Sequence, residues 1–258
     1  MKKKYLVVLT LLLVASLSMA ETLKIGATPR PHAEILELIK PMAKAKGIEI
    51  VIVEFTDYVQ PNIALADGEL DANFFQHKPY LETFSKDRRL ALSSLVAVHI
   101  EPMGAYSKKI KDLNELKKGA SVGIPNDPTN GGRALLLLQA GGLIELDKKA
   151  GILPTTLDVV KNPLNLKFRE LEAAMLPRSL QDLDLAIINT NYALEGGLVP
   201  TKDALIMEGS ESPYANIIAV RTKDLDKPEF KILAEILTSE EVKEFLEKEY
   251  KGSIVAAF

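Results

Sequence analysis

Residues 124–135, IPNDPTNGGRAL, hold the arrangement in this chain that is best suited to bind an anion. The apolar run 121–124 predicts a buried strand, the prolines, Asx residues and glycines that follow predict a turn, and 133–140 predicts an apolar helix. At such a junction, backbone N–H groups point at whatever lies above the helix N-terminus. Arg133, in the first turn of the predicted helix, adds a planar fork of donors that suits a carboxylate. Because the helix dipole disfavours a cation at this end, Arg133 either binds an anionic ligand or pairs with an Asp or Glu on the surface.

A second candidate site is the aromatic and polar stretch 73–80, NFFQHKPY, where a predicted strand ends and a helix starts. Ring faces can line the apolar part of a pocket, while an imidazole or an amide orients the ligand. We assign Phe74 to the core and Phe75 and His77 to the pocket. The alternative for His77 is that it caps the helix that follows.

Three further polar residues follow predicted strands or turns and are candidate ligand contacts. Asn189 ends the apolar strand 183–188, where its amide can donate to a carboxylate and accept from an ammonium. Asn216 opens the apolar run 217–220, and Tyr58 is placed to close the pocket from the other side. Each has a structural alternative: a helix cap for Asn189, a turn for Asn216 and a helix start for Tyr58.

The sequence gives little support to enzyme chemistry. GASVG at 119–123 matches G-x-S-x-G, but a strand follows this serine, whereas the nucleophile motif needs a strand before the serine and a helix after it. His32, His77 and His99 are not spaced as a helical metal-binding pair, and the phosphate-binding patterns of nucleotide enzymes are absent. We therefore expect a protein that is not an enzyme and uses no cofactor and no metal. His77 is the one visible candidate for a catalytic base.

Residues 1–20 have the pattern of a secretory signal peptide. Three lysines precede an uncharged apolar run at 5–17, and Ser18 and Ala20 are small residues at the positions that signal peptidase reads. The run is shorter than the ~20 apolar residues that span a bilayer. We expect cleavage before Glu21 and a periplasmic mature chain that does not insert into the membrane. The alternative is an uncleaved N-terminal anchor.

The composition excludes several other functions. The chain has no cysteine, which excludes disulfides, thiolate metal sites, cysteine nucleophiles and a lipid attached to a cysteine behind the signal peptide. It has 32 Lys+Arg and 35 Asp+Glu, and removing the three N-terminal lysines leaves 29 against 35, a net charge of −6. This balance argues against nucleic acid and anionic membrane surfaces as partners.

The order of strand-like and helix-like segments predicts an α/β fold with two similar lobes. Strands are expected at 23–28, 48–55, 72–75, 90–100, 121–124, 166–170 and 183–188, and helices at 32–46, 58–67, 79–85, 133–140, from 190 onward and at 228–250. The β-α-β-α-β order favours parallel sheets covered by helices, and the β-branched run 48–55 is typical of a buried parallel strand.

We expect the two lobes to be joined by two crossover segments. Lobe one takes residues 21–102 plus 216–258, lobe two takes 103–215, and the crossovers fall near 102–107 and 208–216. Ligands in such folds bind at the carboxyl ends of the strands, here in the cleft between the lobes.

Several of these motifs resemble those of the NlpA-type methionine-binding proteins, the substrate-binding components of methionine ABC importers. The motifs are TP at 28–29, FQHKPYL at 75–81, PNDPTNGGR at 125–133, LPRSL at 176–180, INT at 188–190 and SPY at 212–214. They occur in the same order, and the resemblance runs from about residue 23 to the C-terminus. It implies a two-lobed periplasmic binding protein that closes on a free amino acid and docks on a membrane permease.

Carried over by position, the resemblance implies that Arg133 binds the α-carboxylate of the ligand. Amides that hold the backbone end of the ligand are implied at Asn189 and Asn216, whereas family members often have another residue at the position of Asn191. The residues implied to surround the ligand side chain are Tyr58, Phe75 and His77.

One departure concerns the anchor, because the family is usually lipidated on a cysteine and this chain has none. We interpret the chain as an exported binding protein for L-methionine or a related amino acid, with no chemistry of its own. The alternatives are a different small amino acid or a methionyl peptide as ligand, or an enzyme, such as a lyase or transferase, on the same scaffold. A binding protein retains its ligand unchanged, whereas an enzyme turns it over.

Overall fold

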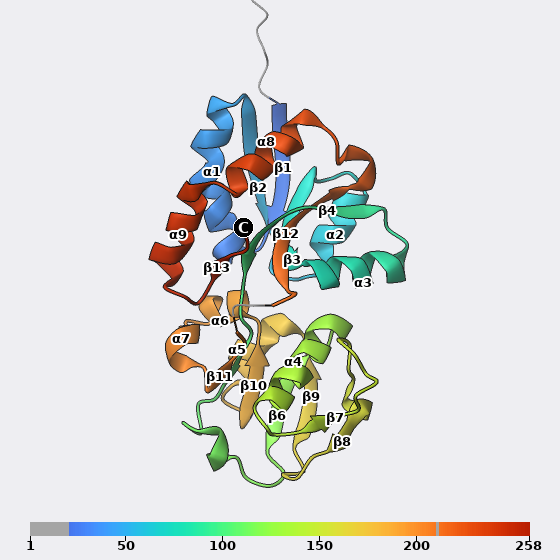
Figure 1. Cartoon of the computed structure of the whole chain (residues 1–258), viewed down its shortest axis with the longest axis vertical. Coiled ribbons are helices and arrows are strands. Elements are labelled where there is room, and N and C mark those ends of the chain that lie inside the picture. Colours follow the sequence, from blue (N-terminus) through green and yellow to red (C-terminus); the bar gives the residue numbers. More distant parts are fainter. Residues whose placement is uncertain (1–20, 210–211) are drawn as a thin grey trace, which may run out of the picture.

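Two β-sheets, one above the other in Figure 1, organise the chain. The computed structural model describes residues 21–209 and 212–258, so the predicted signal peptide at 1–20 lies outside the described residues. Helices cover both sheets, which confirms the predicted α/β fold with two lobes. Within the described part of the chain, no helix is long and apolar enough to cross a membrane.

The sheet of the upper lobe has six strands in the order β13-β4-β12-β3-β1-β2. Their bounds are β1 (Glu21–Ala27), β2 (Ile48–Glu54), β3 (Ala72–His77), β4 (Leu92–Ile100), β12 (Ala215–Arg221) and β13 (Val255–Ala256). β1 is parallel to β2 and β3, but β12 comes from the C-terminal part of the chain and pairs antiparallel with β3 and β4. The strands β1 to β4 therefore run in one direction, as the predicted parallel order requires, and the antiparallel β12 inserts between β3 and β4. The predicted burial of β2 is wrong, because β2 is an edge strand with alternately buried and exposed residues in its first half.

The helices of the upper lobe cover this sheet (Figure 1), and their buried apolar residues join its core. They are α1 (Glu34–Ala45), α2 (Gln60–Ala66), α3 (Lys78–Arg88), α8 (Pro228–Leu237) and α9 (Glu240–Tyr250), with helical turns at Pro29–Ala33 and Thr222–Asp224. In α1, Ile35, Ile39 and Ala43 are buried at four-residue spacing, the pattern of a helix with one apolar face. Pro41 lies inside α1. The predicted tail helix is two helices, divided at Thr238.

The sheet of the lower lobe has five strands in the order β11-β5-β10-β6-β9. Their bounds are β5 (Gly104–Tyr106), β6 (Ser121–Pro125), β9 (Lys167–Leu171), β10 (Leu185–Ile188) and β11 (Ile206–Met207), and a separate pair is formed by β7 (Glu145–Leu146) and β8 (Val159–Lys161). β10, β6 and β9 are parallel, whereas β5 is antiparallel to β10 and β11. The helical segments are α4 (Pro128–Ala140), α5 (Leu176–Ser179), α6 (Thr190–Glu195) and α7 (Pro200–Asp203), with turns at Leu113–Glu115, Thr156–Asp158 and Ala173–Met175.

Helix α4 begins earlier than the sequence predicts, and this changes the interpretation of Arg133. Asp127 is the N-cap: its Oδ1 accepts from the backbone N–H of Asn130 at 2.9 Å, and Pro128 is the first helical residue. Arg133 therefore lies in the second turn, whereas the dipole acts within the first. The Asp127 carboxylate accepts from one of the backbone N–H groups at this end of the helix. The role of Arg133 has to be argued from its own contacts.

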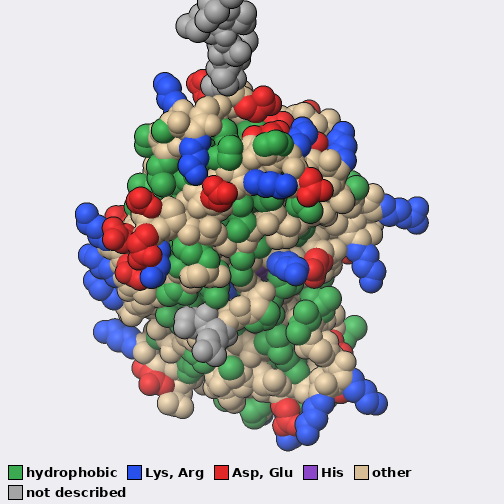
Figure 2. Space-filling model, turned by 45° about the horizontal axis from the view of Figure 1, so that its top comes forward, with side chains coloured by type: hydrophobic (Ala, Val, Ile, Leu, Met, Phe, Trp, Pro, Cys, Tyr) green, Lys and Arg blue, Asp and Glu red, His purple; other side chains and the backbone are tan. Residues whose placement is uncertain are grey.

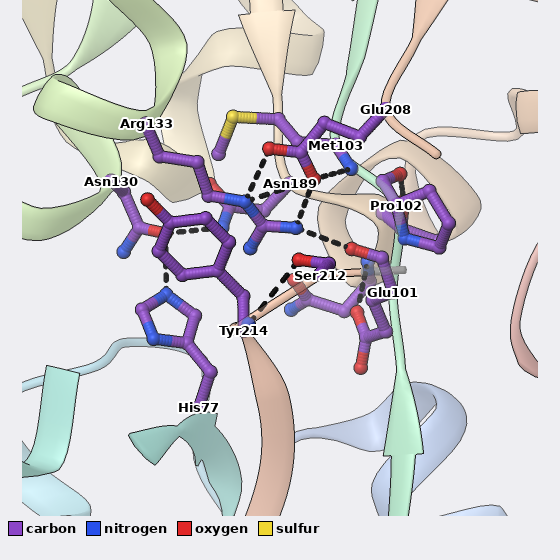
Figure 3. Close-up of polar contacts among 12 residues, drawn as sticks. His77, Glu101, Pro102, Met103, Asn130, Arg133, Asn189, Glu208, Ser212 and Tyr214 are labelled. Carbon is purple, nitrogen blue, oxygen red and sulfur yellow. Dashed lines mark hydrogen bonds and ion pairs between the residues drawn. The ribbon is translucent and has the colours of Figure 1, made fainter. Parts of the chain in front are cut away.

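The chain passes between the two lobes twice. Residues 101–103 connect β4 with β5, and residues 208–214 connect β11 with β12, of which 210–211 lie outside the described residues. Both connections run close to the polar contacts drawn in Figure 3. The ligand-binding residues are therefore to be sought where these connections meet the strand ends.

Candidate ligand-binding site

A small cavity of about 20 Å³, with room for about one water molecule, lies between the lobes. The upper lobe contributes the ends of β3 and β12, and the lower lobe contributes α4 and the start of α6. The lining residues are Tyr58, Phe75, Gln76, His77, Tyr80, Glu101, Asn130, Arg133, Asn189, Thr190, Asn191 and Asn216. All six site residues expected from the sequence are thus brought together, and Asn191 joins them.

Arg133 is the cation of this cavity, and it is almost completely buried. Its Nε donates to Glu208 Oε1 at 2.8 Å, its Nη2 donates to the backbone carbonyl of Glu101 at 2.7 Å, and the Tyr214 ring lies 4.3 Å from the guanidinium carbon (Figure 3). The ion pair foreseen as an alternative therefore exists, but its arginine is buried and its carboxylate is only partly exposed. Every hydrogen bond of Arg133 in the described part of the chain uses Nε or Nη2, so Nη1 is left for a ligand.

Two asparagines at the start of α6 carry buried polar atoms without a partner among the described residues. Asn189 occupies the N-cap position without capping the helix; its Nδ2 donates to Asn130 Oδ1 at 2.7 Å and its Oδ1 is unpaired. Asn191 accepts from the Tyr58 hydroxyl at 2.6 Å and its Nδ2 is unpaired. An unmade hydrogen bond on a buried group costs free energy. These two asparagines therefore offer one acceptor and one donor to a ligand, which suits the ammonium and carboxylate groups of an amino acid.

His77 both caps α3 and lines the cavity, so its two predicted interpretations are compatible. Its Nδ1 accepts from the backbone N–H of Tyr80 at 3.1 Å, which places the ring proton on Nε2, where it donates to Asn130 Oδ1 at 3.1 Å. Burial, and then the nearby charge of Arg133, lower the pKa of His77 to about 3. His77 is therefore a neutral donor with both ring nitrogens engaged, and it is not a free base.

Aromatic rings form the apolar wall of the cavity. The ring centroids of Tyr58, Phe75 and Tyr80 lie 5.8 to 6.0 Å from one another. Successive side chains of a strand point to opposite faces, so Phe74 packs in the core while Phe75 reaches the cavity, as predicted. This wall suits a flexible apolar side chain, and a thioether in particular.

Behind the cavity, a buried cluster supports Asn216. His32 Nε2 lies 3.1 Å from Asn216 Oδ1 and 3.3 Å from Glu101 Oε1, and His99 Nε2 lies 2.8 Å from the same carboxylate oxygen. Burial lowers the pKa of His32 to about 4 and that of His99 to about 3, and it raises the pKa of Glu101. Within the described residues this is the one group with metal-binding geometry. Its members already bond to one another, so we interpret the cluster as a support for Asn216.

Sequence reasoning missed the residues that hold the candidate ligand contacts in place. Asn130, which bridges His77 and Asn189, lies in a motif whose arginine alone was singled out. Glu101 and Glu208 lie in the two connections between the lobes. Their signal in the sequence is weak: an acidic residue beside an apolar strand normally faces solvent, and only the fold turns these two inward.

The fold and the cavity together define a class of protein. Two α/β lobes enclose a polar cavity with an arginine, several amides and an aromatic wall, and its histidine is engaged at both ring nitrogens. The chemistry of these groups suits a small zwitterion with an apolar tail.

The chain belongs to the NlpA lipoprotein family, whose model matches residues 23–258. It is 48% identical over 236 residues to the D-methionine-binding lipoprotein MetQ of Salmonella typhimurium, covering 90% of this chain and 87% of that protein. The same identity and coverage hold for the D-methionine-binding lipoprotein MetQ of Escherichia coli.

Two solved structures are similar over almost the whole fold. A nutrient-binding protein from Burkholderia cenocepacia, bound to methionine, is 50% identical with a TM-score of 0.89, over 92% of this chain and all of that one. A periplasmic substrate-binding protein of an ABC transporter from Coxiella burnetii is 44% identical with a TM-score of 0.88, over 91% and 100%. The chain is accordingly an exported substrate-binding protein and not an enzyme, and the family resemblance seen in the sequence is confirmed.

Proposed function

We propose that this protein captures methionine, or a close analogue, outside the cytoplasm and delivers it to the permease of an ABC importer. The observation that carries the proposal is the pair of unpaired buried atoms, Asn189 Oδ1 and Asn191 Nδ2, beside Arg133 and opposite an aromatic wall. Methionine has an ammonium and a carboxylate for the asparagine atoms and Arg133, and a thioether for the aromatic wall. The printed descriptions of the Salmonella and Burkholderia proteins, which name methionine, support the same ligand.

In the proposed complex, the ligand carboxylate binds Arg133, and Asn189 and Asn216 hold the rest of the backbone end. A free Nη1 on Arg133 and a free Oδ1 on Asn189 support these two roles. The side chains proposed to surround the thioether are Tyr58 and Phe75 of the aromatic wall and the imidazole of His77.

Ligand capture is tested on the purified, folded protein. Small molecules released by denaturation are identified by mass spectrometry, and L-methionine, D-methionine, leucine, glutamine and a methionyl dipeptide are then titrated by calorimetry. We expect release of unchanged methionine and the tightest binding for one methionine stereoisomer. Tighter binding of another amino acid or of the dipeptide would assign a different ligand, and conversion of the ligand during incubation would assign an enzyme.

The proposal extends to processing and partners. We propose cleavage before Glu21, lobes at 21–102 plus 216–258 and at 103–215, and a membrane permease as the protein partner. The absence of cysteine supports a mature chain without a thioether-linked lipid, which intact-mass measurement of the exported protein checks. In Figure 2, acidic and basic side chains are interspersed over the face in view, which supports the expectation that nucleic acid is not a partner.

Replacing Phe75 with alanine should change ligand ranking more than overall affinity. Sulfur–aromatic contacts contribute about 0.3–1.5 kcal/mol each, which ranks methionine above an aliphatic side chain of similar volume without excluding it. Calorimetric titration of methionine, norleucine and leucine against both proteins measures the ranking. Phe84→Ala, which changes a neighbouring buried ring outside the cavity lining, is the matched control. An unaltered ranking in the Phe75 variant would remove this ring from side-chain recognition.

Ligand binding should draw the lobes together about residues 101–103 and 208–214. The cavity is lined from both lobes, so a bound ligand interacts best with the closed arrangement and shifts the population toward it. Small-angle scattering should show a smaller radius of gyration with methionine than without it. The melting temperature should rise in parallel, since a hundredfold excess over Kd stabilises the folded state by about 2.7 kcal/mol. A rise in melting temperature at constant radius would keep the binding site and refute the hinge.

A further inference from the structure

Glu208 is the residue that holds Arg133 most firmly, although it does not line the cavity. Both of its carboxylate oxygens accept from the guanidinium: Nε lies 2.8 Å from Oε1 and 3.1 Å from Oε2, and Nη2 lies 2.5 Å from Oε2 (Figure 3). A bidentate pair of this kind fixes the plane of the guanidinium as well as its position. Glu208 therefore holds Arg133 from outside the lining of the cavity.

The position of Glu208 is itself fixed by the other connection between the lobes. The backbone N–H of Met103 donates to Glu208 Oε2 at 3.0 Å, and the backbone N–H of Glu208 donates to the carbonyl of Met103 at 2.9 Å. The Glu101 carbonyl, two residues before Met103, takes the remaining proton of Arg133 Nη2. The ligand-facing arginine is thus tied to both connections, and Glu208 joins them.

The charge of this arrangement is as informative as its geometry. Arg133 is buried beside a carboxylate, so the pair presents an oriented donor with its positive charge compensated. A lone guanidinium attracts any anion and repels a nearby ammonium. A guanidinium whose charge is balanced by a carboxylate keeps its directed hydrogen bond to the ligand carboxylate. It does not repel the ligand ammonium, which lies two bonds from the carboxylate carbon. Such a site suits a zwitterion and gives no advantage to a simple anion.

We propose that Glu208 is a positioning residue that aims Arg133 Nη1 at the ligand carboxylate and sets the site's preference for zwitterionic amino acids over carboxylic acids without an amino group. The inference rests on the proposed function, because it assumes that Arg133 receives an α-carboxylate. It assigns Glu208 a role in ligand choice without contact to the ligand.

The experiment compares wild type with Glu208→Gln, using methionine and 4-(methylthio)butanoate, which is methionine without its amino group. Glutamine keeps the size of the side chain but removes its charge, and its NH₂ group faces donors of Arg133 or Met103. Methionine should bind about tenfold more weakly to the variant, and its advantage over 4-(methylthio)butanoate should shrink by a similar, roughly tenfold, factor. Competition against isotope-labelled methionine measures both affinities.

Two matched variants separate positioning from a merely structural effect. Glu208→Asp keeps the carboxylate and should keep the ligand ratio even where affinity falls, and it also serves if the glutamine variant does not fold. Glu172→Gln makes the same charge change at an exposed residue outside the cavity and should alter neither quantity.

Equal loss of both ligands in Glu208→Gln would overturn the inference, because a structural defect has no preference for charge. Tighter methionine binding in that variant would overturn it too, since Glu208 would then compete with the ligand for Arg133. A wild-type protein that binds neither methionine nor any related amino acid would instead refute the proposed function.

Discussion

Replacing Arg133 with alanine should weaken methionine binding by about 2–5 kcal/mol, the range for removing one partner of a buried hydrogen-bonded charge pair. The variant loses the donor proposed for the ligand carboxylate. It also leaves Glu208 as a partly buried carboxylate with the Met103 N–H as its remaining described donor. Calorimetric titration with methionine should therefore show a dissociation constant raised by about 30-fold to several thousandfold.

The control for this prediction is Arg178→Ala, because Arg178 is an exposed arginine of the same lobe that lines the neighbouring groove and not the cavity. Its affinity for methionine should stay within twofold of wild type. Arg133→Lys adds a second comparison, since it keeps the charge but loses the fork that Glu208 and the Glu101 carbonyl hold. Wild-type affinity in Arg133→Ala would exclude Arg133 from ligand binding.

Local sequence patterns predicted those site residues that lie where an element ends. Phe75 and His77 close a short apolar strand, and Asn189 follows another, so periodicity alone places them at the edge where ligands bind in α/β folds. Their separate roles needed the fold. Asn189 sits at an N-cap position, as its structural alternative requires, yet its side chain is directed to Asn130.

Contacts between distant segments could not be predicted in this way. β12 inserts between β3 and β4 although more than a hundred residues separate it from them in sequence, and no local pattern records that pairing. The same holds for Arg133 and Glu208, which lie 75 positions apart. The early start of α4 was missed for a local reason: Asp127-Pro128 begins a helix as readily as it continues a turn.

These omissions share a physical cause. A polar side chain that binds a ligand must be held by other polar groups, because buried donors and acceptors are costly unless they are paired. The supporting residues need only be close in space, and the chain supplies them from wherever its connections pass. In this protein the supports are Glu101 and Glu208, and each lies in one of the two connections between the lobes.

Replacing His77 with asparagine should make the free energy of unfolding depend less steeply on pH below about 6.5. Native His77 is neutral because burial and Arg133 lower its pKa to about 3, whereas an unfolded histidine titrates near the usual 6.5. As pH falls below about 6.5, the histidine is protonated in the unfolded state but stays neutral in the native state. The part of the stability that depends on neutral His77 is therefore fully present above that pH and is lost progressively as the pH falls toward about 3.

Asparagine is the chosen replacement because it also caps a helix, so the N–H of Tyr80 keeps an acceptor. Between pH 6.5 and 4, the free energy of unfolding of the variant should fall less steeply than that of wild type, by about 1.4 kcal/mol per pH unit. Two other groups also make stability depend on pH in this range. Buried His32 lowers stability in acid as His77 does, whereas Glu195, whose pKa is raised to about 7, has the opposite effect. Both are present in the two proteins, so their contributions cancel in the comparison. Urea unfolding at half-unit pH steps measures the two slopes. Parallel curves would show that His77 titrates with the same pKa in the native and unfolded states, and its role as a donor that stays neutral in acid would then have to be abandoned.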